Sequence, residues 1–247
     1  MKKQLNIIRQ FSIKNNILPR YFDPNHDINE FLRNYFSSSK DKTIIQIGAN
    51  DGVMSDPLRP FFKIPGNYRA ILVEPLPFYV NKLNLLYGDR DDINIIQAAV
   101  GCNEELKKFY YILPEMADLM NGDGPNNNWA HGQGSFDRSK VIYWIEQNRF
   151  RGEKYCSQIE RFFESIECVE IPLVKTCNIT PNAPNLLMVI VVQGFELDVL
   201  NGINWDHLPN YIMWEDDLDN GKTIDSFLTS MGYIYVCGKH DKIYSHK

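Results

Sequence analysis

The chain has 247 residues, of which 44% are apolar and 23% charged, and 31 acidic against 26 basic residues give a net charge of −5. This composition is typical of a globular chain with enough apolar residues for a core, and it excludes the disordered and fibrous classes. The acidic balance disfavours a nucleic-acid-binding protein, because no basic field is present to attract phosphate groups. At roughly 150 residues per domain, the length predicts one or two domains.

Neither the membrane nor the secretory pathway is indicated by the sequence. The longest apolar run, 186–192, is far shorter than the ~18 residues of a membrane span, and residues 1–11 lack the apolar stretch of a secretory signal. The cysteines are odd in number and widely spaced, which disfavours a disulfide framework or a zinc cluster and favours thiols in a reducing cytoplasm. They are Cys102, Cys156, Cys168, Cys177 and Cys237.

The first predicted element is a helix over 28–37, which follows the N-cap residue Asp27 within an N-terminal extension of residues 1–42. Short apolar strands and helices then alternate in a predicted domain over 43–247. The predicted strands are 43–48, 69–74, 93–100, 186–192, 211–215, 233–237 and 242–245. The predicted helices among them are 78–86, 196–200 and 223–231. This alternation predicts βαβ units and a mostly parallel sheet, whose last two strands are antiparallel because few residues separate them.

Residues 114–170 interrupt this alternation of strands and helices. They follow an aromatic, β-prone segment at 107–113 and contain a turn-rich loop at 121–128 and two polar helical stretches at 138–147 and 153–165. We expect an insertion between the third and fourth strands that forms a lid or substrate wall, in preference to a second full domain. Aromatic side chains gather there and suit a sugar, a dimer contact or a small core of the insertion itself. They are Trp129, Phe136, Tyr143, Trp144, Phe150 and Tyr155.

Two features at strand ends point to a nucleoside ligand. A glycine-rich turn at 47–52 follows the first strand, where backbone can approach a ligand closely, although a tight turn without a ligand explains it too. Glu74 ends the second strand, where a carboxylate can accept both ribose hydroxyls of an adenosine cofactor. The spacing of Gly48 and Gly52 does not match the dinucleotide-binding fingerprint, which weakens the interpretation that a nicotinamide cofactor binds here. A P-loop is excluded, because no G-K-[ST] motif follows the glycine-rich turn.

The end of the third strand, Gln97-Ala98-Ala99, is rich in small residues. Small side chains there would leave room for a flat base. Plain strand packing explains the same residues equally well.

In chain order, the segments 44–52, 56–58, 71–75 and 97–101 resemble motifs of the FkbM family of S-adenosylmethionine-dependent methyltransferases. The segments 131–137 and 193–200 resemble two further motifs of that family, so the resemblance covers about 43–236. It implies a Rossmann-like class I methyltransferase fold, an α/β structure with a seven-stranded, mostly parallel sheet, an antiparallel last strand and helices on both faces. It also implies S-adenosylmethionine as cofactor and O-methylation, often of sugars or natural products.

The motifs and the resemblance together give a set of expected cofactor-binding residues. These are Gly48, Ala49, Asn50, Asp51, Gly52, Asp56, Glu74, Pro75, Gln97, Ala98 and Ala99.

The sequence departs from the family after the fourth strand. Val191 stands where relatives usually carry Asp, and Gln193 where Glu is common, so a general base or metal ligand at that point is in doubt. A sugar hydroxyl needs help to lose its proton, and the candidate catalytic residues are His131, Glu196 and Glu215. An exposed loop histidine and a helix-terminal acid are the structural alternatives for His131 and Glu196.

Residues 215–217 are three consecutive acids that could hold Mg²⁺ together with substrate oxygens, or form a solvated turn. No metal-ligand motif supports the ion, and no metal ligands are predicted.

Three functions remain open from the sequence. The first is a cytoplasmic S-adenosylmethionine-dependent O-methyltransferase acting on a sugar, glycan or other hydroxylated metabolite. The second is a cofactor-binding interaction module of weak activity, suggested by Val191. The third, disfavoured by the glycine spacing, is a nicotinamide-dependent oxidoreductase. The expected partner is a small-molecule or carbohydrate acceptor, with no nucleic acid and no membrane span, and the oligomeric state is open, a homodimer included.

Overall fold

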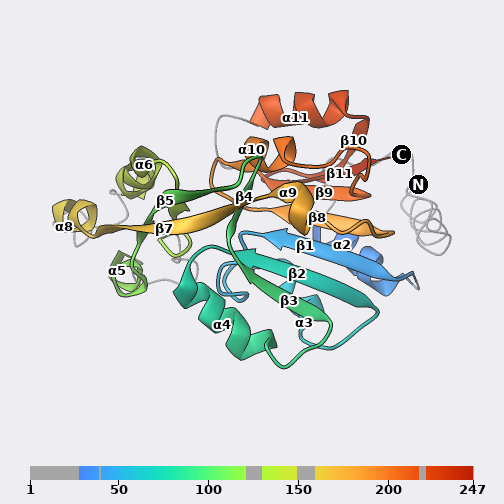
Figure 1. Cartoon of the computed structure of the whole chain (residues 1–247), viewed down its shortest axis with the longest axis horizontal. Helices are drawn as coiled ribbons and strands as arrows, with labels where there is room; N and C mark the ends of the chain where they lie inside the picture. The colour runs from blue at the N-terminus through green and yellow to red at the C-terminus, as the bar shows by residue number, and fades with distance from the viewer. Residues whose placement is uncertain (1–27, 39, 121–129, 149–158, 217–220, 247) are drawn as a thin grey trace, which may run out of the picture.

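A computed structural model of the chain was analysed (Figure 1). It describes residues 28–38, 40–120, 130–148, 159–216 and 221–246. Residues 1–27 of the predicted N-terminal extension, the whole predicted loop at 121–128 and residues 153–158 of a predicted helix lie outside these ranges. None of the helices within the described ranges is long and apolar enough to cross a bilayer.

A seven-stranded sheet forms the centre of the molecule, in the order β10-β11-β9-β8-β1-β2-β3. Its strands are parallel except β11, the last in the chain, which is antiparallel to both β9 and β10. The strands are β1 Lys42–Ile47, β2 Tyr68–Glu74, β3 Ile93–Gln97, β8 Leu186–Ile190, β9 Tyr211–Glu215, β10 Tyr233–Gly238 and β11 Asp241–His246. The class I methyltransferase fold expected from the sequence, with its antiparallel last strand, is confirmed.

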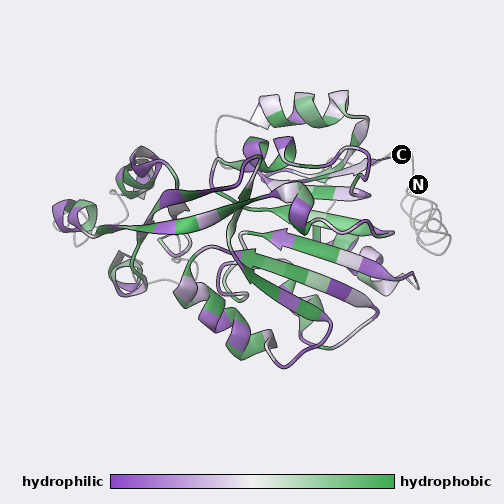
Figure 2. Ribbon diagram, viewed as in Figure 1, coloured by the Kyte–Doolittle hydropathy of each residue, from purple (hydrophilic) through white to green (hydrophobic). Residues whose placement is uncertain are grey.

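The central strands are apolar throughout because helices cover both faces of the sheet. In Figure 2, long green stretches run along these strands. Ile44, Val189 and Met213 point to one face, and Ile45 and Met188 to the other. The first face packs against α2 Ile28–Ser37, α3 Arg59–Phe62 and part of α4 Pro77–Tyr87. The second packs against α10 Glu196–Asn201 and α11 Gly221–Ser230.

The predicted third strand, 93–100, is divided between two sheets. It leaves the large sheet after Gln97, and a short strand, β4 Ala99–Gly101, belongs to a four-stranded sheet of order β4-β7-β5-β6. The other strands of this smaller sheet are β5 Glu105–Ile112, β6 Gly134–Ser135 and β7 Ile166–Lys175. A long antiparallel β5–β7 ribbon therefore extends from the carboxyl edge of the large sheet (Figure 1).

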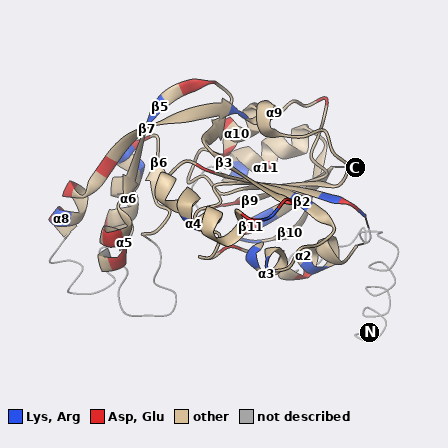
Figure 3. Ribbon diagram, turned by 60° about the horizontal axis from the view of Figure 1, so that its bottom comes forward, with Lys and Arg blue, Asp and Glu red and all other residues tan. Residues whose placement is uncertain are grey.

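The inserted segment packs its own helices against this ribbon. Val141, Ile145 and Phe162 form a small buried cluster with Ile112 and Ala117. The helices concerned are α5 Pro114–Met120, α6 Arg138–Asn148 and α8 Ile159–Glu164. A four-residue helix, α9 Thr176–Ile179, then leads the chain back to β8. Figure 3 shows acidic residues on α5 and, over the other coloured elements, basic and acidic residues interspersed with one another.

Candidate functional site

A cavity of about 600 Å³ lies at the carboxyl ends of β1, β2, β8 and β9, where open α/β sheets bind ligands. The insertion supplies the opposite wall through residues 131–136 and Trp144. Of the expected cofactor residues, the cavity is lined by Gly48, Ala49, Asn50, Asp56, Glu74, Pro75, Ala98 and Ala99. Asp51, Gly52 and Gln97 do not line it, and Gln97 is exposed at the end of β3.

The glycine-rich turn after β1 crosses the end of β8 closely. Gly48 has φ +82°, and a β-carbon added there would lie 1.9 Å from the backbone oxygen of Val191. The fold itself therefore requires glycine at residue 48. Of the two explanations that the sequence left open, a tight turn therefore accounts for Gly48 without a ligand. Gly52 is likewise constrained by packing, since a β-carbon there would meet the side chain of Leu83 at 2.8 Å.

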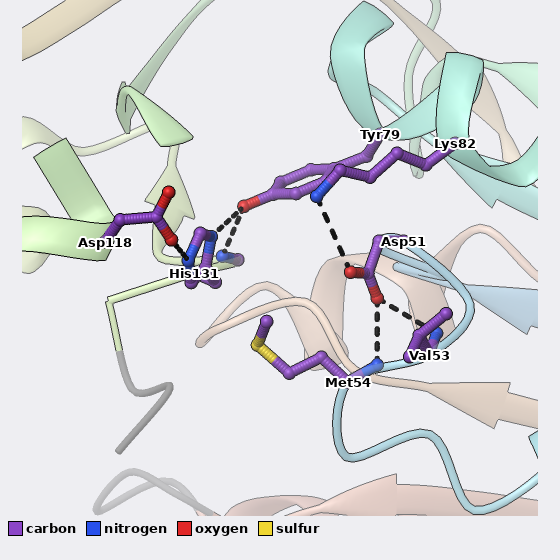
Figure 4. Close-up of polar contacts among 8 residues, drawn as sticks. Asp51, Val53, Met54, Tyr79, Lys82, Asp118 and His131 are labelled. Carbon is purple, nitrogen blue, oxygen red and sulfur yellow. Dashed lines mark hydrogen bonds and ion pairs between the residues drawn. The ribbon is translucent and has the colours of Figure 1, made fainter. Parts of the chain in front are cut away.

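Asp51 stabilises the glycine-rich turn through hydrogen bonds to its backbone. Its Oδ1 accepts hydrogen bonds from the backbone N–H groups of Val53 (2.9 Å) and Met54 (2.8 Å), as Figure 4 shows. Its other oxygen lies 3.7 Å from Lys82 Nζ. Asp51 therefore shapes the loop that carries Asn50 and does not itself face the cavity.

Glu74 is a buried carboxylate at the cavity wall, with 5% of its surface exposed. One oxygen accepts from the Asn50 backbone N–H at 2.9 Å and the other from the Leu76 N–H at 3.0 Å. Burial raises the pKa of Glu74 to about 7; the two N–H donors oppose that rise, and the charge of Asp51 adds to it. Each oxygen keeps a lone pair, so the group can still accept two hydrogen bonds from a ligand.

Asp56 is held in a similar way beside β1. Its Oδ1 accepts from Gln46 Nε2 at 3.2 Å and from the Leu58 N–H at 2.8 Å. Burial raises the pKa of Asp56, while these hydrogen bonds act in the opposite direction.

His131 forms a three-residue chain with Tyr79 and Asp118 (Figure 4). His131 Nε2 lies 2.8 Å from Asp118 Oδ1, and His131 Nδ1 lies 3.4 Å from the Tyr79 hydroxyl, which also accepts from the Gly132 N–H at 3.0 Å. Burial raises the pKa of Tyr79, so the phenol keeps its proton. If the phenol donates to His131 Nδ1, the His131 proton lies on Nε2 and faces Asp118.

This chain joins the insertion to the core at the Glu74 end of the cavity. Tyr79 lies on α4, which begins three residues after Glu74, and the two groups interact electrostatically. The His131 side chain is only 6% exposed, in contrast to the exposed loop histidine considered from the sequence. Sequence analysis missed Tyr79 and Asp118, because their relation to His131 depends on tertiary contacts.

The other two catalytic candidates lie in different surroundings. Glu196 is buried, does not line the cavity, and accepts a hydrogen bond from the Gly194 N–H at 2.9 Å. Glu215 lines the cavity at the end of β9, and its Oε2 accepts from Gln193 Nε2 at 3.2 Å. Glu215 is therefore the acid candidate that faces the cavity, at the end opposite His131.

Aromatic rings form one wall of the cavity. The rings of Phe136 and Phe109 are 5.3 Å apart, and those of Phe136 and Phe195 are 4.7 Å apart, with Lys107 Nζ 4.9 Å from the Phe136 centroid. Of the aromatic residues that the sequence singled out, Phe136 and Trp144 line the cavity and Tyr143 is exposed. Trp129, Phe150 and Tyr155 lie outside the described residues.

Four amide side chains of the cavity lining have a buried oxygen without a hydrogen-bond partner among the described residues. They are Gln46, Asn50, Gln133 and Gln193. A buried acceptor without a partner costs about 1–3 kcal/mol. A ligand rich in hydrogen-bond donors would offset part of this cost, so the lining favours a polyhydroxylated or amino-containing ligand over an apolar one.

Two solved structures of methyltransferases are similar to this chain. One is methyltransferase FkbM from Methylobacillus flagellatus KT, with 14% identity and a TM-score of 0.49 over 83% of this chain and 44% of that one. The other is a precorrin-6y C5,15-methyltransferase from Geobacter metallireducens GS-15, with 10% identity and a TM-score of 0.43 over 93% of each chain. The chain thus spans less than half the length of the M. flagellatus protein. No curated protein matched the sequence.

The methyltransferase FkbM domain matches residues 46–235, which is most of the chain. This match confirms the resemblance found in the sequence motifs. It runs from the end of β1 into β10 and leaves out β11. The chain belongs to the FkbM methyltransferase family.

Proposed function

We propose that this protein is an S-adenosylmethionine-dependent O-methyltransferase that methylates a hydroxyl of a sugar, a glycan or another hydroxylated metabolite. The observation that carries the proposal is Glu74. A buried carboxylate, fixed by two backbone N–H groups and lining a cavity at the end of β2, has the chemistry needed to accept hydrogen bonds from the two ribose hydroxyls of an adenosine group.

The residues around Glu74 fit the rest of such a cofactor. Ala98 and Ala99 are small, buried and part of the lining, so they leave space for a flat base. Asn50 and Gln46 provide amide oxygens without partners among the described residues, which suit the amino group and hydroxyls of the cofactor. When bound, S-adenosylmethionine supplies an electrophilic methyl group on a sulfonium.

The two ends of the cavity would then have different roles. Glu74, Tyr79 and His131 lie together at one end, so we assign His131 to enclosing the cofactor rather than to proton transfer. Glu215 lies on β9, three strands from Glu74 in the sheet, which corresponds to about 14 Å at the usual strand spacing. We assign Glu215 to the acceptor end, where it would help orient a hydroxyl and favour the loss of its proton.

The cavity lining also indicates the class of acceptor. The Phe136 and Phe195 rings offer flat apolar surfaces to the C–H faces of a sugar, while Gln193 and Glu215 offer polar groups to its hydroxyls. In this proposal the insertion is the substrate wall. The protein's residues would orient the acceptor oxygen toward the methyl group and exclude water.

A cofactor-binding module of weak activity is the second candidate, and Val191 is the observation that favours it. Val191 lines the cavity with a side chain that can neither take a proton nor bind a cation. The two candidates agree on the cofactor and differ only in turnover.

Titration calorimetry with S-adenosylhomocysteine, S-adenosylmethionine and NAD tests the cofactor. We expect the first two to bind and NAD not to bind. Glu74→Gln should weaken S-adenosylhomocysteine binding roughly 10- to 100-fold, because it removes a charged acceptor of two hydrogen bonds. Gln97→Ala is the matched control, since Gln97 ends the neighbouring strand with its side chain outside the cavity.

Equal affinities for the wild type and Glu74→Gln, with both folded, would reject Glu74 as the ribose ligand. A methyl-transfer assay with panels of sugars and glycans, read out as S-adenosylhomocysteine release, then separates an enzyme from a binding module. Tight cofactor binding without turnover on any acceptor would favour the module.

A further inference from the structure

Three metal-binding side chains meet at the acceptor end of the cavity. Glu215 ends β9, and His240 and Asp241 lie where β10 turns into β11. One ligand atom of each lies within 4.8 Å of the other two, and all three residues line the cavity. His240 Nδ1 is 3.9 Å from a Glu215 oxygen and 4.0 Å from an Asp241 oxygen.

The backbone fixes two of these groups opposite each other. Asp241 and Glu215 are direct partners in the antiparallel β9–β11 pairing, so their side chains lie on the same face of the sheet. The Asp216 N–H donates to the His240 oxygen at 2.8 Å and holds the turn against the end of β9. Like charges directly opposite on paired strands are destabilising, so this arrangement costs stability unless a positive charge lies between them.

Lys242 on β11 contacts a different pair of acids. Lys242 Nζ lies 2.7 Å from Asp216 and 2.8 Å from Asp225, so it neutralises that pair of acids. The cluster of Glu215, His240 and Asp241 differs from an ordinary acidic surface because it contains an imidazole. The His240 side chain is 62% exposed and has room to rotate. Two carboxylates and one imidazole form a donor set that suits a divalent transition-metal ion such as Mn²⁺ better than Mg²⁺, which prefers oxygen ligands.

We propose that Glu215, His240 and Asp241 bind a divalent cation at the acceptor end of the cavity. Neighbouring ligand atoms on such an ion are about 3 Å apart for bonds of about 2.1 Å. The distances from His240 Nδ1 to the Glu215 and Asp241 oxygens exceed that value by about 1 Å. Rotation of the His240 and Asp241 side chains can bring the ligand atoms to the shorter distance. Three protein ligands would leave the remaining coordination positions for water or for acceptor oxygens.

The role of the ion rests on the proposed function. The acceptor hydroxyl would coordinate the ion and release its proton to solvent. Its oxygen would then form the new O–CH₃ bond as the C–S bond breaks and its electron pair returns to sulfur. The ion would thereby supply the activation that an Asp at residue 191 would otherwise give.

Electron paramagnetic resonance of the full chain with added Mn²⁺ tests the site without any acceptor. We expect one bound ion, with nitrogen modulation from an imidazole ligand. His240→Gln should remove the nitrogen signal, and His240→Gln and Asp241→Asn should each weaken Mn²⁺ binding at least tenfold. The control is the double variant Asp206→Asn/His207→Gln, which changes an exposed Asp–His pair before the start of β9, the end opposite to Glu215, and should bind Mn²⁺ like the wild type.

Absence of a bound ion, or binding that His240→Gln and Asp241→Asn leave unchanged, would overturn the proposal. These outcomes are distinguishable from failure of the proposed function, because S-adenosylhomocysteine binding is measured separately by calorimetry. Cofactor binding without Mn²⁺ binding would overturn the proposed metal site and leave the proposed cofactor site intact. Mn²⁺ binding that does not increase methyl transfer would leave a metal site and overturn its assigned role.

Discussion

Gly48 and Val191 belong to segments 143 residues apart, yet a β-carbon on Gly48 would lie 1.9 Å from the Val191 backbone oxygen. The turn after β1 is thus packed tightly against the end of β8. We predict that Gly48→Ala destabilises the fold by about 3 kcal/mol or more, because a positive φ and a backbone clash add together. Urea unfolding followed by circular dichroism measures this.

Gly132→Ala is the matched comparison. Gly132 also has a positive φ, of +81°, but an added β-carbon would meet only the Asn50 side-chain nitrogen, which can move. We expect a cost of about 1 kcal/mol there. If Gly48→Ala proved no more costly than Gly132→Ala, the contact with Val191 would not be the constraint described above.

Much of the fold could be predicted because the large sheet has a strong local signal. Strands such as Leu186–Ile190 are apolar on both faces, and the helix Ile28–Ser37 has its apolar residues on one side. The strand β7 Ile166–Lys175 escaped prediction because Glu167, Glu170 and Pro172 interrupt its apolar residues without a regular alternation. The division of 93–100 between two sheets also had no local signal.

The site residues also divide into those with a local sequence signal and those that depend on tertiary contacts. Glu74 could be placed from sequence because it ends an apolar strand at a motif distance from Gly48. Tyr79, Asp118, His240 and Asp241 could not, because they meet their partners only when the insertion and the last hairpin fold back over the cavity edge. Glu196 differs from both groups. Its motif position suggested a catalytic role, whereas in the structure its carboxylate accepts a hydrogen bond from the Gly194 N–H.

The ionisation of Glu74 should appear in the stability of the ligand-free protein. Its folded pKa of about 7 lies above the ordinary value of 4.5, so the native state holds the proton more tightly than the unfolded state. The free energy of unfolding should therefore fall as pH rises from about 4.5 to 7. We expect Glu74 to contribute a loss of roughly 2 kcal/mol between pH 5 and pH 8.

Urea unfolding of the wild type and Glu74→Gln across that range isolates this contribution. The amide introduced by Glu74→Gln does not titrate and keeps one acceptor for the two N–H donors, so the stability of the variant should lack this decline. Relative to the variant, the wild type should lose stability as pH rises. A constant difference between the two proteins from pH 5 to pH 8 would mean that Glu74 titrates at its ordinary pKa.

Tyr79 should be needed to hold the insertion against the core. Tyr79→Phe would leave the Gly132 N–H without its acceptor, at a cost of about 1–2 kcal/mol, and would weaken S-adenosylhomocysteine binding by loosening the wall at residues 131–134. Tyr87→Phe is a control on the same helix, because the Tyr87 hydroxyl is 3.5 Å from its acceptor, the Gly52 oxygen, and should cost under about 0.5 kcal/mol. Equal effects of the two variants would contradict this role.

The last prediction concerns the position where relatives usually carry Asp. Val191 is partly buried, packs against the core cluster that contains Val189 and Met213, and lines the cavity. Its backbone N–H already donates to the Ile47 oxygen at 3.0 Å, so a change of side chain leaves the strand pairing intact. We predict that Val191→Asp folds, with a loss of about 1–2 kcal/mol from replaced apolar contacts.

We further expect Val191→Asp to raise methyl transfer, because a carboxylate at the end of β8 can orient the acceptor hydroxyl or take its proton. Val191→Asn is the control that loses the same packing without adding a charge. Thermal melts and S-adenosylhomocysteine release should show similar stabilities for the two variants and faster release for Val191→Asp alone. Severe unfolding of Val191→Asp, or no gain over Val191→Asn, would show that the valine serves packing at a site that activates its acceptor by other groups.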